Sequence, residues 1–208
     1  PMAVRMIQML SMGHHLQRNI NAGQLFGLEN IYDHYLSEGA ADRMCAYLKE
    51  RWEKPGSRYH VMKEMFACLH KLEVLSADWP KKVRHYEKVL FGGGRKQYEA
   101  LHQYRMPDKI AEQLLSYFIY VYFAGAVYDG MPYSKVKLAV ISTMLIEDMV
   151  CAKAAEKGQL SFEAIADAAH SYAREVEHSD LNLQRLSTMF KHQKCFHIGR
   201  LCGALLEW

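Results

Sequence analysis

The longest stretch of the sequence without a charged residue is QLLSYFIYVYFAGAVY, Gln113–Tyr128. It is shorter than the roughly 20 apolar residues that a helix needs to cross a bilayer. It also carries four tyrosines and a serine. We therefore expect it to form one buried central helix over about 108–128, around which the rest of the chain packs.

Outside this stretch, apolar residues recur at intervals of three and four, which is typical of amphipathic helices. Strict alternation over the length of a strand is hard to find. The pattern predicts an all-α fold with orthogonal or bundle-like packing of about eight to nine helices in a single domain, 1–208. The predicted helices span 2–19, 28–53, 58–74, 79–91, 95–105, 108–128, 134–157, 161–178 and 180–204.

Local helix signals support these boundaries. KPGS, 54–57, contains a Pro and Gly break and places Ser57 as an N-cap. SADWP, 76–80, places Asp78 as the cap of a helix with Pro80 in its first turn. KGQLS, 157–161, ends one helix at Gly158 and caps the next with Ser161.

Composition narrows the function classes. The chain has 26 basic and 23 acidic residues, a net charge of +3, and no tract of like charge. This pattern does not indicate a nucleic acid or membrane partner. The five cysteines are far apart and form no CxxC pair, so we expect buried thiols in a reducing cytoplasm and no bound metal.

Two kinds of sequence motif resemble functional sites, but each is a weak indication of function. FGGGRKQ, 91–97, resembles a phosphate-binding loop, but it follows a helix and lacks the required spacing, so a flexible helix connector is the better interpretation. Glu-x-x-His occurs at Glu99–His102 and Glu175–His178, a spacing found in di-iron bundles. A chain this rich in glutamate and histidine contains such pairs by chance, and the further ligands required, Glu112 and Glu147, are not compelling.

AREVEHSDLN, 173–182, is unusually polar for this chain. On a helical wheel its polar residues lie opposite the helix's own apolar stripe, and Ser179 or Asp180 caps the following helix. The polar face is either solvated, or turned toward a substrate, a cofactor or another domain, with His178 able to titrate near neutrality and Glu175 or Glu177 able to tune it. The stripe comprises Ile165, Ala169, Tyr172 and Val176, and the polar face comprises His170, Arg174, Glu177 and His178.

The region from about Tyr98 to Leu186 resembles the C-terminal region of the flagellin lysine-N-methylase family. The resemblance rests on EQLLSYFIYVYFAGAVYDG, 112–130, and above all on YAREVEHSDLN, 172–182. This chain departs from the family pattern at Ser116, where members often have asparagine, and at Ala173, where a serine is expected.

The resemblance implies methyl transfer to the ε-amino groups of lysines on flagellin, with S-adenosylmethionine as the methyl donor, in a bacterial protein. Family members begin with a cysteine-rich segment thought to hold an iron–sulfur cluster. No such group of cysteines occurs in this sequence. We therefore expect the C-terminal part of a longer protein, with flagellin and the missing cysteine-rich segment as partners. Alone, the chain should bind no cofactor and be inactive.

Spacing and resemblance together suggest five site residues. Glu177 and His178 are expected as polar partners of the lysine or as its base, and Arg174 as the anchor for a carboxylate. Tyr172 and Tyr117 are expected as aromatic neighbours of the donor's cationic sulfonium. Tyr172 also fits the apolar stripe.

Two other function classes stay open. The first is a module without chemistry of its own that binds flagellin or docks the cysteine-rich domain. The second is a helical domain that binds a small molecule in an apolar pocket. The tyrosines expected to line such a pocket are Tyr117, Tyr120, Tyr122 and Tyr128.

Overall fold

The computed structural model describes residues 2–52 and 57–207, apart from the side chains of 51 and 52. These residues form helices, turns and loops, and no strand occurs among them. The predicted all-α class is therefore confirmed. The helices are α1 (Met2–Asn21), α2 (Leu28–Leu36), α3 (Ala40–Trp52), α4 (Ser57–Leu69), α5 (Trp79–Phe91), α6 (Gly94–Leu101), η1 (His102–Tyr104), α7 (Asp108–Tyr122), η2 (Phe123–Gly125), α8 (Ala126–Asp129), α9 (Pro132–Lys157), α10 (Phe162–Val176), α11 (Asp180–His192), η3 (Lys194–Phe196) and α12 (Ile198–Leu206).

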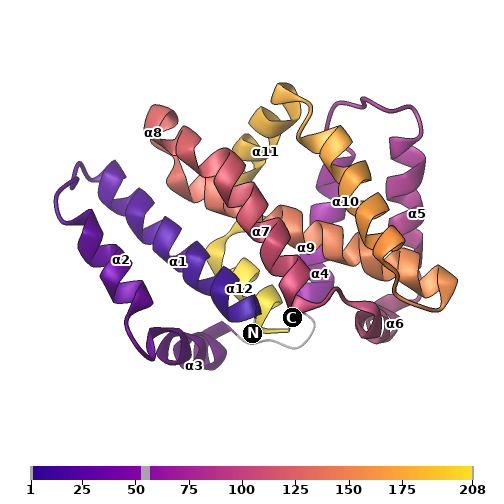
Figure 1. Ribbon diagram of the computed structural model, residues 1–208, viewed down its shortest axis with the longest axis horizontal. Coiled ribbons are helices and arrows are strands. Elements are labelled where there is room, and N and C mark those ends of the chain that lie inside the picture. The colour runs from indigo at the N-terminus through magenta and orange to yellow at the C-terminus, as the bar shows by residue number, and fades with distance from the viewer. Residues whose placement is uncertain (1, 53–56, 208) are drawn as a thin grey trace.

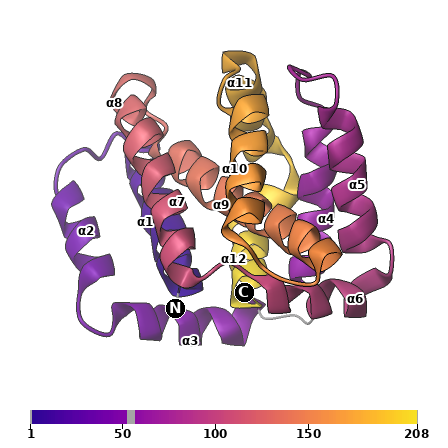
Figure 2. The same ribbon diagram turned by 45° about the vertical axis from the view of Figure 1, so that its right-hand side comes forward.

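The core is organised around α9, the longest helix (Figure 1). Every residue from Val136 to Ala152 is buried. The helix contacts α1, α4 to α8, α10 and α11. Figure 2 shows α1 and α7 on one side of the molecule, α4 and α5 on the other, and α10 between them.

The middle of α9 carries two buried carboxylates, Glu147 and Asp148. Arg58 of α4, itself 2% exposed, places Nη2 2.7 Å from Asp148 Oδ1 and 3.4 Å from Glu147 Oε2. The hydroxyl of Tyr98 donates to Asp148 Oδ2 at 2.7 Å, and Arg105 Nε lies 3.4 Å from Glu147 Oε1. These partners allow a charged segment to form the centre of the fold, because buried charges need close opposite charges and hydrogen bonds.

The prediction that 108–128 forms the buried central helix is wrong. Only Ala111, Leu115 and Phe118 of α7 are buried, and they form the face that packs against α9. Tyr120 is 88% exposed and Tyr128 is 93% exposed. By length and composition alone the 22 residues from Asp108 to Asp129, with mean hydropathy 1.3, are sufficient to cross a membrane. In this fold they form α7, η2 and α8 at the surface, and α7 has one buried face.

Several predicted helices are interrupted. The predicted helix 28–53 divides into α2 and α3 around Gly39, whose φ of +68° is left-handed. The predicted helix 180–204 divides into α11, η3 and α12. The first three residues of the KPGS break, 54–56, lie outside the described residues, and Ser57, predicted as an N-cap, is the first residue of α4.

The predicted helix ends around α10 are confirmed. Gly158 ends α9 with a φ of +72°, and Ser161 accepts the amide N–H of Ala164. Ser179 caps α11 in the same way. Asp78 precedes α5, but its side chain makes no capping hydrogen bond.

Candidate functional site

The polar segment 173–182 holds the connection between α4 and α5 against the start of α11. Glu175 is completely buried, and its Oε2 accepts the backbone N–H groups of Leu75 at 3.0 Å and Ser76 at 3.2 Å. Its carboxylate is thus committed to the loop, which argues against the expected role of tuning His178.

Asn182 completes this contact from the first turn of α11. Its Oδ1 accepts the N–H of Glu73 at 2.6 Å, and its Nδ2 donates to the carbonyl of Glu73 at 3.0 Å. Nδ2 also donates to the carbonyl of Glu175 at 2.7 Å, near the end of α10, where carbonyls lack helical partners. Ser179 donates to Glu73 Oε2 at 2.9 Å. We call Glu175, Ser179 and Asn182 the loop clamp.

Glu177 lies beyond the clamp and faces α7. Its Oε2 accepts hydrogen bonds from the hydroxyls of Tyr117 at 2.9 Å and Tyr122 at 3.1 Å. The hydrogen bond to Glu177 raises the pKa of Tyr117, whereas burial, followed by the charge of Glu177, raises that of Tyr122. Both hydroxyls therefore remain protonated donors at neutral pH. These three residues are called the carboxylate–tyrosine site.

The other predicted site residues lie elsewhere. Arg174 donates from Nη2 to Ser76 Oγ at 3.2 Å, and so contacts the loop. Tyr172 is 1% exposed, and its hydroxyl pairs with Ser142 at 2.8 Å in the core. His178 is exposed, and its side chain makes no hydrogen bond or ion pair in the part of the chain that the structure describes. Among the described residues, Tyr117 and Glu177 are the one pair of the five predicted residues whose side chains share a hydrogen bond.

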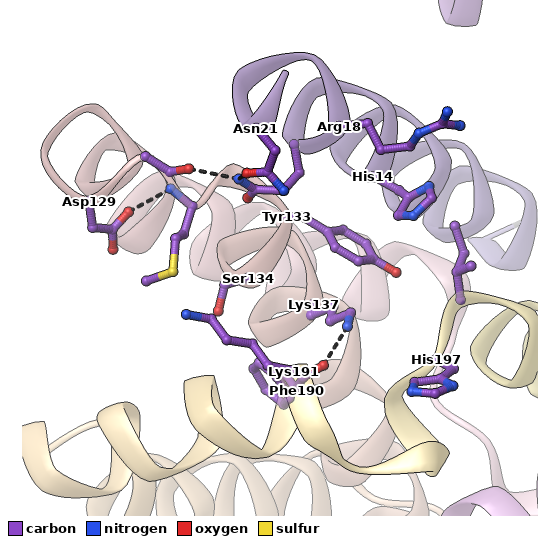
Figure 3. A pocket seen from close by; sticks show the side chains of 14 residues that line it. His14, Arg18, Asn21, Asp129, Tyr133, Ser134, Lys137, Phe190, Lys191 and His197 are labelled. Carbon is purple, nitrogen blue, oxygen red and sulfur yellow. Dashed lines mark hydrogen bonds between the residues drawn. The ribbon is translucent and has the colours of Figure 1, made fainter. Parts of the chain in front are cut away.

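A separate cavity of about 700 Å³ lies between α1, the turn from α8 to α9, α11 and the start of α12 (Figure 3). Its lining is mainly basic, and Asp129 is the single carboxylate among the lining residues that the structure describes. Asp129 is already engaged by Lys135 at 2.6 Å and by the N–H of Met131 at 2.9 Å. The basic lining residues are His14, Arg18, Lys137, Lys191 and His197.

Lys137 is the buried member of these basic lining residues, with 6% of its surface exposed. Its Nζ donates to the carbonyl of Phe190 at 2.7 Å and lies 4.4 Å from the ring centroid of Tyr133. Burial lowers the pKa of Lys137 to about 8. Sequence reasoning missed this residue. The one available signal was a lone lysine followed by an apolar run, VKLAVI at 136–141.

Among the described residues, no three His, Cys, Asp or Glu side chains are grouped so that they could hold a metal ion. Glu99 is paired with Arg95 at 2.6 Å, and Glu175 belongs to the loop clamp. The two Glu-x-x-His pairs are therefore explained by helix and loop contacts.

The fold and these contacts define a class: an all-helical domain in which a polar helix junction positions a surface carboxylate between two tyrosines. Within this class, the family model described as the FliB lysine N-methylase C-terminal domain matches residues 1–204. The chain belongs to that family, and the match extends the recognised region to its first residues. Comparisons with curated proteins and with solved structures gave no match.

Proposed function

We propose that this chain serves methyl transfer to lysine side chains of flagellin, as the C-terminal domain of a lysine N-methylase. The observation that carries the proposal is the family match over residues 1–204. The reaction takes place in the cytoplasm, in keeping with five free thiols. S-adenosylmethionine is the proposed methyl donor, and any iron–sulfur cluster would belong to a cysteine-rich partner segment.

Within this function we assign the carboxylate–tyrosine site to the lysine. A half-buried carboxylate attracts an ammonium group, and Tyr117 and Tyr122 hold Glu177 in place by donating to one of its oxygens. The nitrogen needs a free lone pair to attack a methyl group, so a proton must leave first. His178, exposed at the next position, is the base that we assign to this proton.

The methyl donor would supply an electrophilic methyl group on a sulfonium. The cavity of Figure 3 does not fit such a ligand, because a sulfonium is a cation and the cavity presents Arg18, Lys137 and Lys191. We therefore assign no donor site within this chain.

The test is the steady-state methylation of flagellin by the intact protein carrying Glu177→Gln. Loss of a charge-assisted hydrogen bond to the lysine should lower kcat/KM for flagellin about tenfold or more, mainly through KM. His178→Ala should lower kcat, because the lysine loses the base that takes its proton.

The matched control is Tyr120→Phe, on the same helix as Tyr117 but 88% exposed and outside the site. It should have wild-type kinetics, whereas Tyr117→Phe should raise KM. Normal kcat and KM in Glu177→Gln, with unchanged circular dichroism, would remove the carboxylate–tyrosine site from the reaction.

A second candidate function is a non-catalytic module that binds flagellin or docks the cysteine-rich segment. The observation that favours it is a row of exposed apolar side chains on α7 and α8, which we call the α7–α8 surface. Contiguous exposed apolar area marks interaction sites in many proteins. Its members are Tyr117, Tyr120, Val121, Val127 and Tyr128.

Two substitutions separate the candidates. Val127→Asp and Tyr128→Asp place a charge on the α7–α8 surface while leaving Glu177 and its two tyrosines intact. Under the module proposal, both variants weaken binding of flagellin or of the cysteine-rich segment, and Glu177→Gln leaves kcat/KM for flagellin unchanged. If docking is normal in both variants while Glu177→Gln loses methylation, the module proposal is wrong.

A further inference from the structure

The basic cavity extends beyond the lining shown in Figure 3. A second cavity of about 590 Å³ adjoins it and shares His14, Arg18 and Ile198. The second cavity adds His15, His34 and Arg43, and no carboxylate lines it among the residues described. We call the two cavities together the basic groove. It runs along α1 and has an excess of cationic side chains over its full length.

The positive charges of the groove are not neutralised by carboxylates in its own lining. Its single lining carboxylate, Asp129, is already held by Lys135, which lies outside the lining. Arg18 is exposed at the rim, and across the described ranges its side chain has no ion pair or hydrogen bond. The groove therefore has an unneutralised positive charge, which favours anions.

Burial of Lys137 makes this excess of positive charge unfavourable for the folded protein. The residue is 6% exposed, and its ammonium group has a carbonyl and an aromatic ring as neighbours. A carbonyl and a ring replace hydration only in part, so a buried cation of this kind is destabilising unless an anion neutralises it. Asp148, on the same helix, is also buried, but its charge is paired with that of Arg58. Lys137 has no such ion pair among the described residues.

We propose that the basic groove binds a small anionic molecule through its phosphate or carboxylate oxygens, with Lys137 and Arg18 as the main contacts. Lys137 donates a hydrogen bond to the ligand from the floor of the cavity, and Arg18 contacts the ligand from the rim. The ligand is distinct from S-adenosylmethionine, whose sulfonium and ammonium groups give it a net positive charge. The site lies on α1, α9 and α11, away from the contact between Glu177 and α7.

The test is calorimetric titration of the protein with pyrophosphate and with citrate, at an ionic strength held constant with sodium chloride. One of the two anions should bind at a single site, and the one that binds identifies phosphate or carboxylate as the recognised group. Lys137→Met and Arg18→Gln should each weaken this binding about tenfold or more. Lys153→Met is the matched control, since Lys153 lies on the same helix but outside the groove.

Three results would overturn the proposal: no binding of either anion, equal affinity in Arg18→Gln and the wild type, or tighter Lys137-dependent binding of S-adenosylmethionine. Arg18→Gln keeps the test decisive if Lys137→Met changes the core, because Arg18 is exposed. Flagellin methylation by Glu177→Gln is measured separately. A failure to bind anions would therefore not contradict the proposed function, and normal methylation by Glu177→Gln would not contradict the anion site.

Discussion

Replacing Asn182 with alanine tests the loop clamp. The side chain of Asn182 is fully buried and makes three hydrogen bonds, two to the backbone of Glu73 and one to the carbonyl of Glu175. Alanine removes all three and leaves the carbonyl of Glu175 without its partner at the end of α10. The substitution also opens a small cavity between α10, α11 and the loop.

The magnitude follows from these contacts. At about 1 kcal/mol for each hydrogen bond, and more for a buried group left unpaired, the loss is about 3 kcal/mol. For a chain of about 200 residues, each kcal/mol shifts the melting temperature by about 2–4 °C, so Tm should fall by about 6–12 °C. Asn182→Asp should be at least as harmful, because it turns a donor into a second acceptor facing two carbonyls.

The assay is urea unfolding followed by circular dichroism at 222 nm, with Asn30→Ala as the control. Asn30 lies in α2 and is exposed, so its replacement should change the free energy of unfolding by less than about 0.5 kcal/mol. If Asn182→Ala destabilises no more than Asn30→Ala, the clamp does not hold the loop and the reasoning fails.

The remaining predictions concern the core and its buried charges. Burial raises the pKa of Glu147 from 4.5 to about 7, against the opposing charges of Arg58 and Arg105. The unfolding free energy should therefore fall by up to about 3 kcal/mol as pH rises from about 4.5 to 7, and Glu147→Gln should flatten this decline. Burial lowers the pKa of Lys137 from 10.5 to about 8, so stability should rise between about pH 8 and 10.5, a rise that thermal melts of Lys137→Met should lack. Met144→Ala, at a fully buried position of α9, should cost about 2–5 kcal/mol in urea unfolding; an effect near zero would contradict the placement of α9 at the centre.

The sequence by itself determined the features that depend on local interactions. The all-α class follows from apolar periodicity, and the caps at Ser161 and Ser179 follow because a hydroxyl reaches an amide only three residues away. Gly158 ends α9 for an equally local reason, its left-handed backbone. The segment 172–182 was also sufficient to indicate the family that matches residues 1–204.

Only the tertiary structure decided which helix is central. The charge-free stretch of α7 looked more suitable for burial than α9, which contains Lys137, Glu147 and Asp148. Burial of Asp148 depends on Arg58, 90 positions away in the chain, and hydropathy along the sequence does not reveal such a partner.

The same physical reason separates the members of the polar segment. Glu175 accepts the N–H of Leu75 across 100 positions, and Glu177 accepts the hydroxyl of Tyr117 across 60. Glu175 and Glu177, two residues apart at the end of α10, thus have different partners, one in the core and one at the surface. Helical spacing placed Glu177 on the polar face, but the packing of α10 against the loop and α7 decided that Glu175 contacts the loop and that Glu177 contacts Tyr117 and Tyr122.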